Sequence, residues 1–164
     1  MKKILIILLS CVPFLYGCTH NESIQEKFNI LKDLDYSEFK GIDILNRKGV
    51  YLINYHGSEY SIKRNFFTKN ISSIERDSSK EKDVLLTKKD TDYIENTLKS
   101  FDKIGVIVLS VDEKGNVFLS IPWYDMCTYN FLRLSPTNSL KDIKMQNYQN
   151  YEDNWYMDKE CSER

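Results

Sequence analysis

The sequence predicts one small α+β domain, an antiparallel sheet of about five strands with two helices packed on one face. Two segments place apolar residues at helical spacing, and several short runs are rich in β-branched and aromatic residues, with turn residues between them. Aromatic residues make up 13% of the chain, which favours an ordered domain with strands over disorder. The order of helix, hairpin, helix and β-meander is typical of this class.

Apolar spacing and capping residues locate the two helices. The first is expected over residues 23–34, with Asn21 or Ser23 as its cap, and the second over residues 88–101. Thr87 and Asp90 approximate a capping box at the start of the second helix, and Gly105 ends it. The apolar positions are Ile24, Phe28, Leu31 and Leu34 in the first helix, and Ile94, Leu98 and Phe101 in the second.

The expected strands are separated by turn residues. Gly41 and residues 46–49 are expected to break the segment after the first helix, and residues 65–83 are expected to form mostly a loop. Residues 106–111 are almost continuously apolar, which indicates a central strand covered on both faces. The other strands are expected over 50–55 and 60–64, which form a hairpin around His56, and then over 117–121 and 128–134. Tyr148, Tyr151 and Trp155 fit a helix by their spacing, but the polar, Tyr-rich run around Glu152 and Asp153 favours a final hairpin.

The first eighteen residues form a secretory signal. Met1, Lys2 and Lys3 supply a cationic start, residues 4–15 are mostly apolar, and the chain turns polar at Thr19. A membrane-spanning helix needs about 20 predominantly apolar residues, and this run is shorter and interrupted. The segment is therefore expected to direct export.

The sequence Leu15-Tyr16-Gly17-Cys18 resembles the lipobox of bacterial lipoproteins, apart from Tyr16, where that family usually has a small residue. The resemblance implies cleavage between Gly17 and Cys18 and acyl chains, such as palmitate, on Cys18. It divides the chain into a signal peptide (1–17), a lipidated tether (18–22) and one α+β domain (23–164). Two or more acyl chains hold a protein stably on a membrane.

Alternatives to this assignment remain open. A rival box ends at Cys11, but it leaves an apolar core of only residues 4–9. An uncleaved anchor and an ordinary cleaved secretory signal are the other two. The resemblance implies a lipid-anchored protein of the cell envelope. Thr19, rather than aspartate, after Cys18 implies the outer membrane in a diderm host, and the location is otherwise the cell membrane.

The cysteines have different expected roles. Cys11 would leave with the signal and Cys18 would carry lipid, so Cys127 and Cys161 remain in the domain. Outside the cytoplasm such a pair favours a disulfide, which would stabilise the fold by about 2–4 kcal/mol. Two unpaired thiols, with Cys161 on a frayed tail, are the alternative.

The composition argues against several kinds of site. The net charge is −1, and loss of Lys2 and Lys3 makes it −3, so no basic excess is present for nucleic acid. The spacing of cysteines and histidines does not match a zinc site, and the 6 glycines are scattered, which disfavours a phosphate-binding loop. We therefore expect no metal and no cofactor.

Candidate chemistry is sparse. His56 is expected in a hairpin turn, where a solvated histidine is the default. Trp123, Tyr124 and Asp125 follow the break at Pro122, and aromatic faces beside an acid can hold a sugar or a cationic group, although packing is the default for such residues.

Three hypotheses of function stand. The first is a non-catalytic envelope lipoprotein that binds a protein partner or envelope component. The second is an immunity-type inhibitor that neutralises a toxin at the membrane. The third is a small envelope hydrolase that works through Asp125 or His56.

Overall fold

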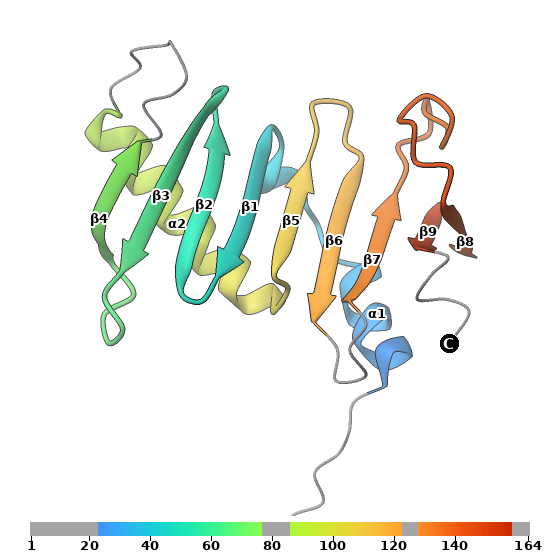
Figure 1. Cartoon of the computed structure of the whole chain (residues 1–164), viewed down its shortest axis with the longest axis horizontal. Helices are drawn as coiled ribbons and strands as arrows, with labels where there is room; N and C mark the ends of the chain where they lie inside the picture. The colour runs from blue at the N-terminus through green and yellow to red at the C-terminus, as the bar shows by residue number, and fades with distance from the viewer. Residues whose placement is uncertain (1–22, 77–85, 123–127, 159–164) are drawn as a thin grey trace, which may run out of the picture.

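The computed structural model describes residues 23–76, 86–122 and 128–158 (Figure 1). Within these residues the chain forms two α-helices, one short 3₁₀-helix and nine strands. The bounds are α1 (Ile24–Lys32), η1 (Ser37–Phe39), β1 (Ile42–Arg47), β2 (Val50–Tyr55), β3 (Ser58–Arg64), β4 (Ile71–Arg76), α2 (Lys88–Ile104), β5 (Val108–Val111), β6 (Val117–Pro122), β7 (Thr128–Arg133), β8 (Tyr148–Glu152) and β9 (Trp155–Asp158).

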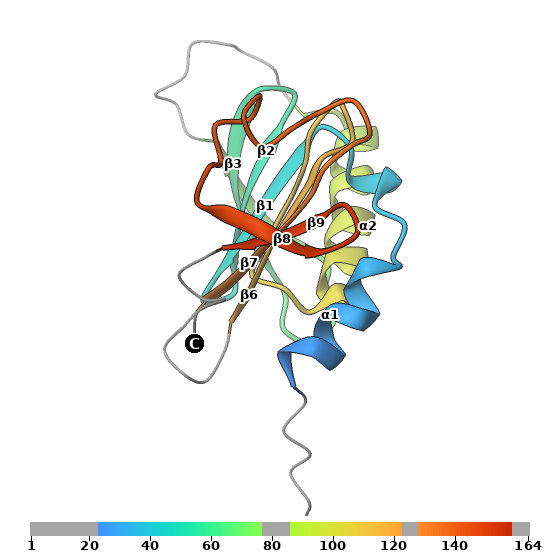
Figure 2. The same ribbon diagram turned by 90° about the vertical axis from the view of Figure 1, so that its right-hand side faces the viewer.

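All nine strands belong to one antiparallel sheet in the order β4-β3-β2-β1-β5-β6-β7-β9-β8. Both α-helices lie on the same face of the sheet, as the edge-on view in Figure 2 shows. The predicted α+β class and the antiparallel sheet are therefore confirmed. The expectation of about five strands is wrong, because the described residues form nine.

The two helices begin where their capping residues predict. Ser23 caps α1, and its hydroxyl accepts a hydrogen bond from the Glu26 backbone N–H at 3.2 Å. Thr87 and Asp90 form a reciprocal capping box at α2. Gly105 ends α2 in the left-handed conformation with φ 71°, which glycine adopts without steric cost. The first helix is shorter than expected and the second is longer.

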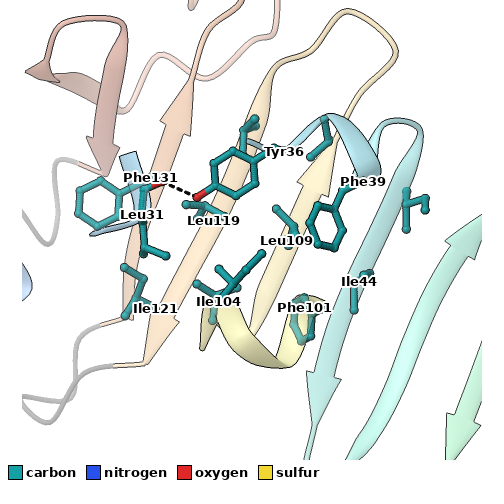
Figure 3. Close-up of a cluster of buried hydrophobic side chains, with 14 of the residues drawn as sticks. Leu31, Tyr36, Phe39, Ile44, Phe101, Ile104, Leu109, Leu119, Ile121 and Phe131 are labelled. Carbon is teal, nitrogen blue, oxygen red and sulfur yellow. Dashed lines mark hydrogen bonds between the residues drawn. The ribbon is translucent and has the colours of Figure 1, made fainter. Parts of the chain in front are cut away.

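The main core lies between the sheet and the helices. The α2 side chains Ile94, Leu98, Phe101 and Ile104 are buried against the sheet, because their spacing places them on one helical stripe. Figure 3 shows part of this core, including Phe101 and Ile104 of α2 beside Leu109 of β5. The core residues that the structure describes all lie between Phe28 and Met157.

The strands missing from the prediction are polar or directly follow a turn. The predicted break at residues 46–49 is confirmed at Lys48 and Gly49, which form the two-residue turn between β1 and β2 with φ 52° and 82°. Asn46 and Arg47 belong instead to β1, a strand that the sequence pattern does not predict. In the segment 65–83, expected to be mostly loop, Ile71–Arg76 forms strand β4. Strand β4 lies at the edge of the sheet, where polar residues are common.

The expected central strand is central, but it is not fully covered. Strand β5 is fifth among the nine strands, and Leu109 and Val111 face the helices and are buried. The alternate residues Val108 and Ser110 face the other side and are half-buried. The expectation that both faces of this strand are covered is therefore wrong, and the reason is the open outer face described next.

Candidate functional site

The face of the sheet opposite the helices, which we call the outer face, is covered at one end. The segment between β7 and β8 packs Leu140, Ile143 and Met145 against the outward side chains of β6, β7 and β9 and forms a small second core. Over β3, β2, β1 and β5, the outward side chains are exposed or half-buried. An open apolar and polar surface therefore lies at the middle of the sheet.

Three apolar side chains form the floor of this surface. The register places Leu45 of β1 directly opposite Leu52 of β2 on one side and Val108 of β5 on the other. Leu52 is 41% exposed, while Leu45 and Val108 are half-buried. Adjacent apolar residues at outward positions break the usual alternation of apolar and polar residues in a half-covered sheet. This row gives a partner apolar area to contact on an otherwise polar face.

Carboxylates border the apolar floor. Asp43 is paired in register with Asn54, which is paired in turn with Glu59, and Ser61 is paired with Glu75. These side chains and the floor line a pocket of about 520 Å³, together with Arg76. Three carboxylates and one guanidinium make the pocket acidic. Asp43 also accepts a hydrogen bond from the Ser110 hydroxyl, which fixes its carboxylate at the border.

The carboxylates at the border are exposed to solvent. Their main contribution to binding would be long-range attraction of a basic partner surface. Lys63 and Glu75 form an ion pair at 3.7 Å, with both side chains more than half exposed. A surface pair of this kind stabilises the fold by less than about 1 kcal/mol. The border is therefore suited to attract a basic surface, while the floor supplies apolar contact.

His56 lies at a different place, in the turn between β2 and β3. His56 and Gly57 both have positive φ, at 52° and 75°, as a two-residue hairpin turn requires. The prediction that His56 lies in a hairpin turn is confirmed. Its ring lies 4.0 Å from the ring of Tyr55. A second pocket of about 520 Å³ is lined by His56, Tyr55, Tyr93, Glu113 and Lys40, among others.

Burial and local hydrogen bonds shift the pKa values of two side chains near this second pocket, Tyr55 and Asp90. The Tyr55 hydroxyl donates to Asp90 Oδ1 at 3.2 Å, and burial raises the pKa of Tyr55. Hydrogen bonds from Thr87 lower the pKa of Asp90. Glu113, which the sequence did not single out, lies in the same pocket as His56 because the β5–β6 turn reaches the same edge of the sheet as the β2–β3 turn (Figure 1).

Six residues singled out from the sequence lie outside the described ranges: Cys18, Trp123, Tyr124, Asp125, Cys127 and Cys161. Among the residues that the structure does describe, no group of three or more His, Cys, Asp or Glu side chains could hold a metal ion. Neither of the two described α-helices has the length and apolar composition needed to cross a bilayer.

A comparison of the chain with protein-family models, with curated proteins and with solved structures found no match.

Proposed function

We propose that the chain is a membrane-anchored bacterial lipoprotein whose domain is a non-catalytic module that binds a protein partner through the outer face. The observation that carries the binding role is the row formed by Leu45, Leu52 and Val108, of which Leu52 is exposed and the other two are half-buried, with carboxylates at its border. The partner would supply a basic surface with an apolar ridge. Apolar contact supplies affinity at such a surface, and the charges supply orientation and association rate.

The anchor rests on the lipobox at Cys18, and a labelling experiment tests it. Labelled palmitate is expected on the wild-type protein in its own host and is expected to be lost in Cys18→Ala, because the thioether sulfur is removed. Cys11→Ala is the matched control, since it removes the rival cysteine, and it should keep the label. Label that persists in Cys18→Ala would contradict the anchor at this position.

The outer face is tested by reversing the charge of its border. Glu59→Lys combined with Glu75→Lys is expected to lower recovery of the crosslinked partner from native membranes by about tenfold or more, because both carboxylates line the pocket. Asp33→Lys with Asp92→Lys is the control, since both residues are exposed, lie outside the pocket and give the same change in charge. Equal loss of partner in both pairs would mean that net charge, not the outer face, governs binding.

The protein partner could be a toxin, in which case the chain is an immunity-type inhibitor. This hypothesis is tested by the survival of a strain that lacks the gene for this chain when it is challenged with neighbouring strains. Loss of resistance would identify an immunity-type inhibitor, and unchanged survival would argue against that role while leaving the binding module in place.

A small envelope hydrolase is the second candidate. The observation that favours it is the pocket shared by His56 and Glu113, an imidazole and a carboxylate. If the chain is a hydrolase, His56→Gln should abolish hydrolysis. If the chain is a binding module, His56→Gln should capture its partner as well as the wild type does.

A further inference from the structure

The tip of the β3–β4 hairpin exposes two adjacent aromatic rings. Phe66 is 77% exposed and Phe67 is 88% exposed. The rings contact each other edge-on with centroids 5.4 Å apart, and the Lys69 ammonium lies 5.0 Å from the Phe66 ring. Two large apolar side chains side by side in solvent mark an interaction surface more often than an isolated exposed residue does.

The hairpin tip is held in place by its own hydrogen bonds. The Asn65 carboxamide oxygen accepts from the backbone N–H groups of Phe67 and Thr68 at 2.9 and 3.0 Å. Arg64 donates to the Lys69 carbonyl and, at 2.8 Å, to the Asp102 carboxylate of α2. The two rings are therefore presented on a turn that is fixed to the body of the domain.

The tip lies at the same edge of the sheet as the start of α1. In Figure 1 the β3–β4 loop and the N-terminal end of α1 are both at the lower edge, with the β2–β3 and β5–β6 turns at the upper edge. Ser23, the cap of α1, is five residues after Cys18. Five residues span at most about 18 Å. A lipid on Cys18 would therefore bring this lower edge close to the bilayer.

The same edge carries basic side chains. Arg47 and Lys48 are exposed at the β1–β2 turn, and Lys103 is exposed in the last turn of α2. Within the described residues, no carboxylate forms an ion pair with these three or with Lys69. The carboxylate of Asp102, which lies near this edge, is already paired with Arg64. Cations beside exposed aromatic rings suit the headgroup region of an anionic membrane.

We propose that this edge is a second membrane contact, in which Phe66 and Phe67 enter the interface between headgroups and acyl chains and the four basic residues meet anionic headgroups. This proposal rests on the proposed anchor at Cys18 only for the statement that the lower edge faces the bilayer. The lipid before α1 and the aromatic tip between β3 and β4 would then attach the lower edge at two places and hold the strands upright on the bilayer. The outer face then stays open sideways to a partner.

Photocrosslinking in the intact lipidated protein tests the contact directly. A benzoylphenylalanine in place of Phe67 is expected to form lipid adducts in native membranes, detected by mass spectrometry. The same group in place of Tyr93 is the control, because Tyr93 is exposed on α2 and donates to Glu38 near the upper edge, and it should give no lipid adducts. Lipid adducts absent at position 67, or equally frequent at position 93, would overturn the proposal.

Vesicle binding separates this contact from the anchor. A chain of residues 19–164 contains the whole described core and lacks Cys18. It should bind vesicles of phosphatidylglycerol and phosphatidylcholine. The partition coefficient should fall about tenfold or more in the double variant Phe66→Ser/Phe67→Ser. Leu52→Ser, an exposed leucine on the outer face, should bind like the wild type. Thermal unfolding of the double variant should match the wild type, since both rings are exposed. Equal vesicle binding by the double variant, or no vesicle binding by the unsubstituted chain, would refute the contact, whereas palmitate label that persists in Cys18→Ala would refute only the anchor.

Discussion

Replacement of Phe28 by alanine is expected to lower the free energy of unfolding by about 3–5 kcal/mol. Phe28 is fully buried, and its ring stacks on Phe131 with centroids 4.8 Å apart. It also meets Tyr151 and Trp155 edge-on, at 4.8 and 5.6 Å. This aromatic cluster joins α1 to β7, β8 and β9. A helix of nine residues is marginal by itself, so the loss should also detach α1 from the sheet.

Urea unfolding followed by circular dichroism measures this effect. Ile30→Ala is the matched control, because Ile30 lies on the same helix and is 57% exposed. We expect a change within about 0.5 kcal/mol for the control, as is usual at surface positions. Similar losses in both variants would mean that the loss in Phe28→Ala does not come from the aromatic cluster.

Stability is expected to fall steeply above about pH 10 because of buried tyrosines. Burial raises the pKa of Tyr36 and of Tyr148, which are 1% and 5% exposed. The Tyr36 hydroxyl donates to the Leu31 carbonyl at 2.7 Å (Figure 3). Both phenols therefore stay protonated in the folded domain at a pH where they ionise in the unfolded chain.

The sign of this effect follows from proton binding. Above the unfolded pKa, the folded state binds more protons than the unfolded state, so stability decreases as pH rises. Below that pKa the contribution of both tyrosines is fully present. Each tyrosine lowers the free energy of unfolding by up to about 1.4 kcal/mol per pH unit in this range.

Urea midpoints between about pH 9 and 11 test the prediction. Tyr36→Phe should lose part of the slope, because one of the ionising groups is gone while its ring remains. A slope unchanged in Tyr36→Phe would show that Tyr36 does not couple ionisation to unfolding.

The sequence was most informative where a local pattern determines the structure. Thr87, Asp90 and Gly105 predict both ends of α2, because capping and left-handed termination involve neighbouring residues. The β2–β3 hairpin follows from the turn at His56 in the same way. Strand β4 was missed because its residues are polar and its pairing with β3 includes a register shift between Lys63 and Arg64.

The outer face could be predicted only in part. Leu45 and Leu52 are close in sequence, but Val108 joins them through pairing of β1 with β5, which lie on either side of α2 in the chain. Sequence periodicity does not report such long-range pairing. The exposed pair Phe66 and Phe67 was visible in the sequence, within a segment expected to be polar loop. Whether these two rings can reach a membrane depends on whether the β3–β4 tip lies at the same edge of the sheet as the start of α1. Only the three-dimensional fold shows this.

The proposed anchor and the two surfaces are geometrically compatible. The lower edge of the sheet carries the start of α1 and the aromatic tip, whereas the outer face is a broad side of the sheet (Figures 1 and 2). A protein held at this edge would therefore keep the row of Leu45, Leu52 and Val108 accessible. Membrane attachment and partner binding would use different parts of the domain.

Site-specific photocrosslinking at Leu52 tests the central claim most directly. With benzoylphenylalanine at Leu52 in the intact lipidated protein, we expect one dominant protein adduct in native membranes, and we expect its yield to fall with Glu59→Lys/Glu75→Lys. The same group at Asn96, which is exposed on α2 on the opposite side of the sheet, should not give that adduct. Adduct formation at Asn96 and not at Leu52 would contradict the outer face as the binding surface.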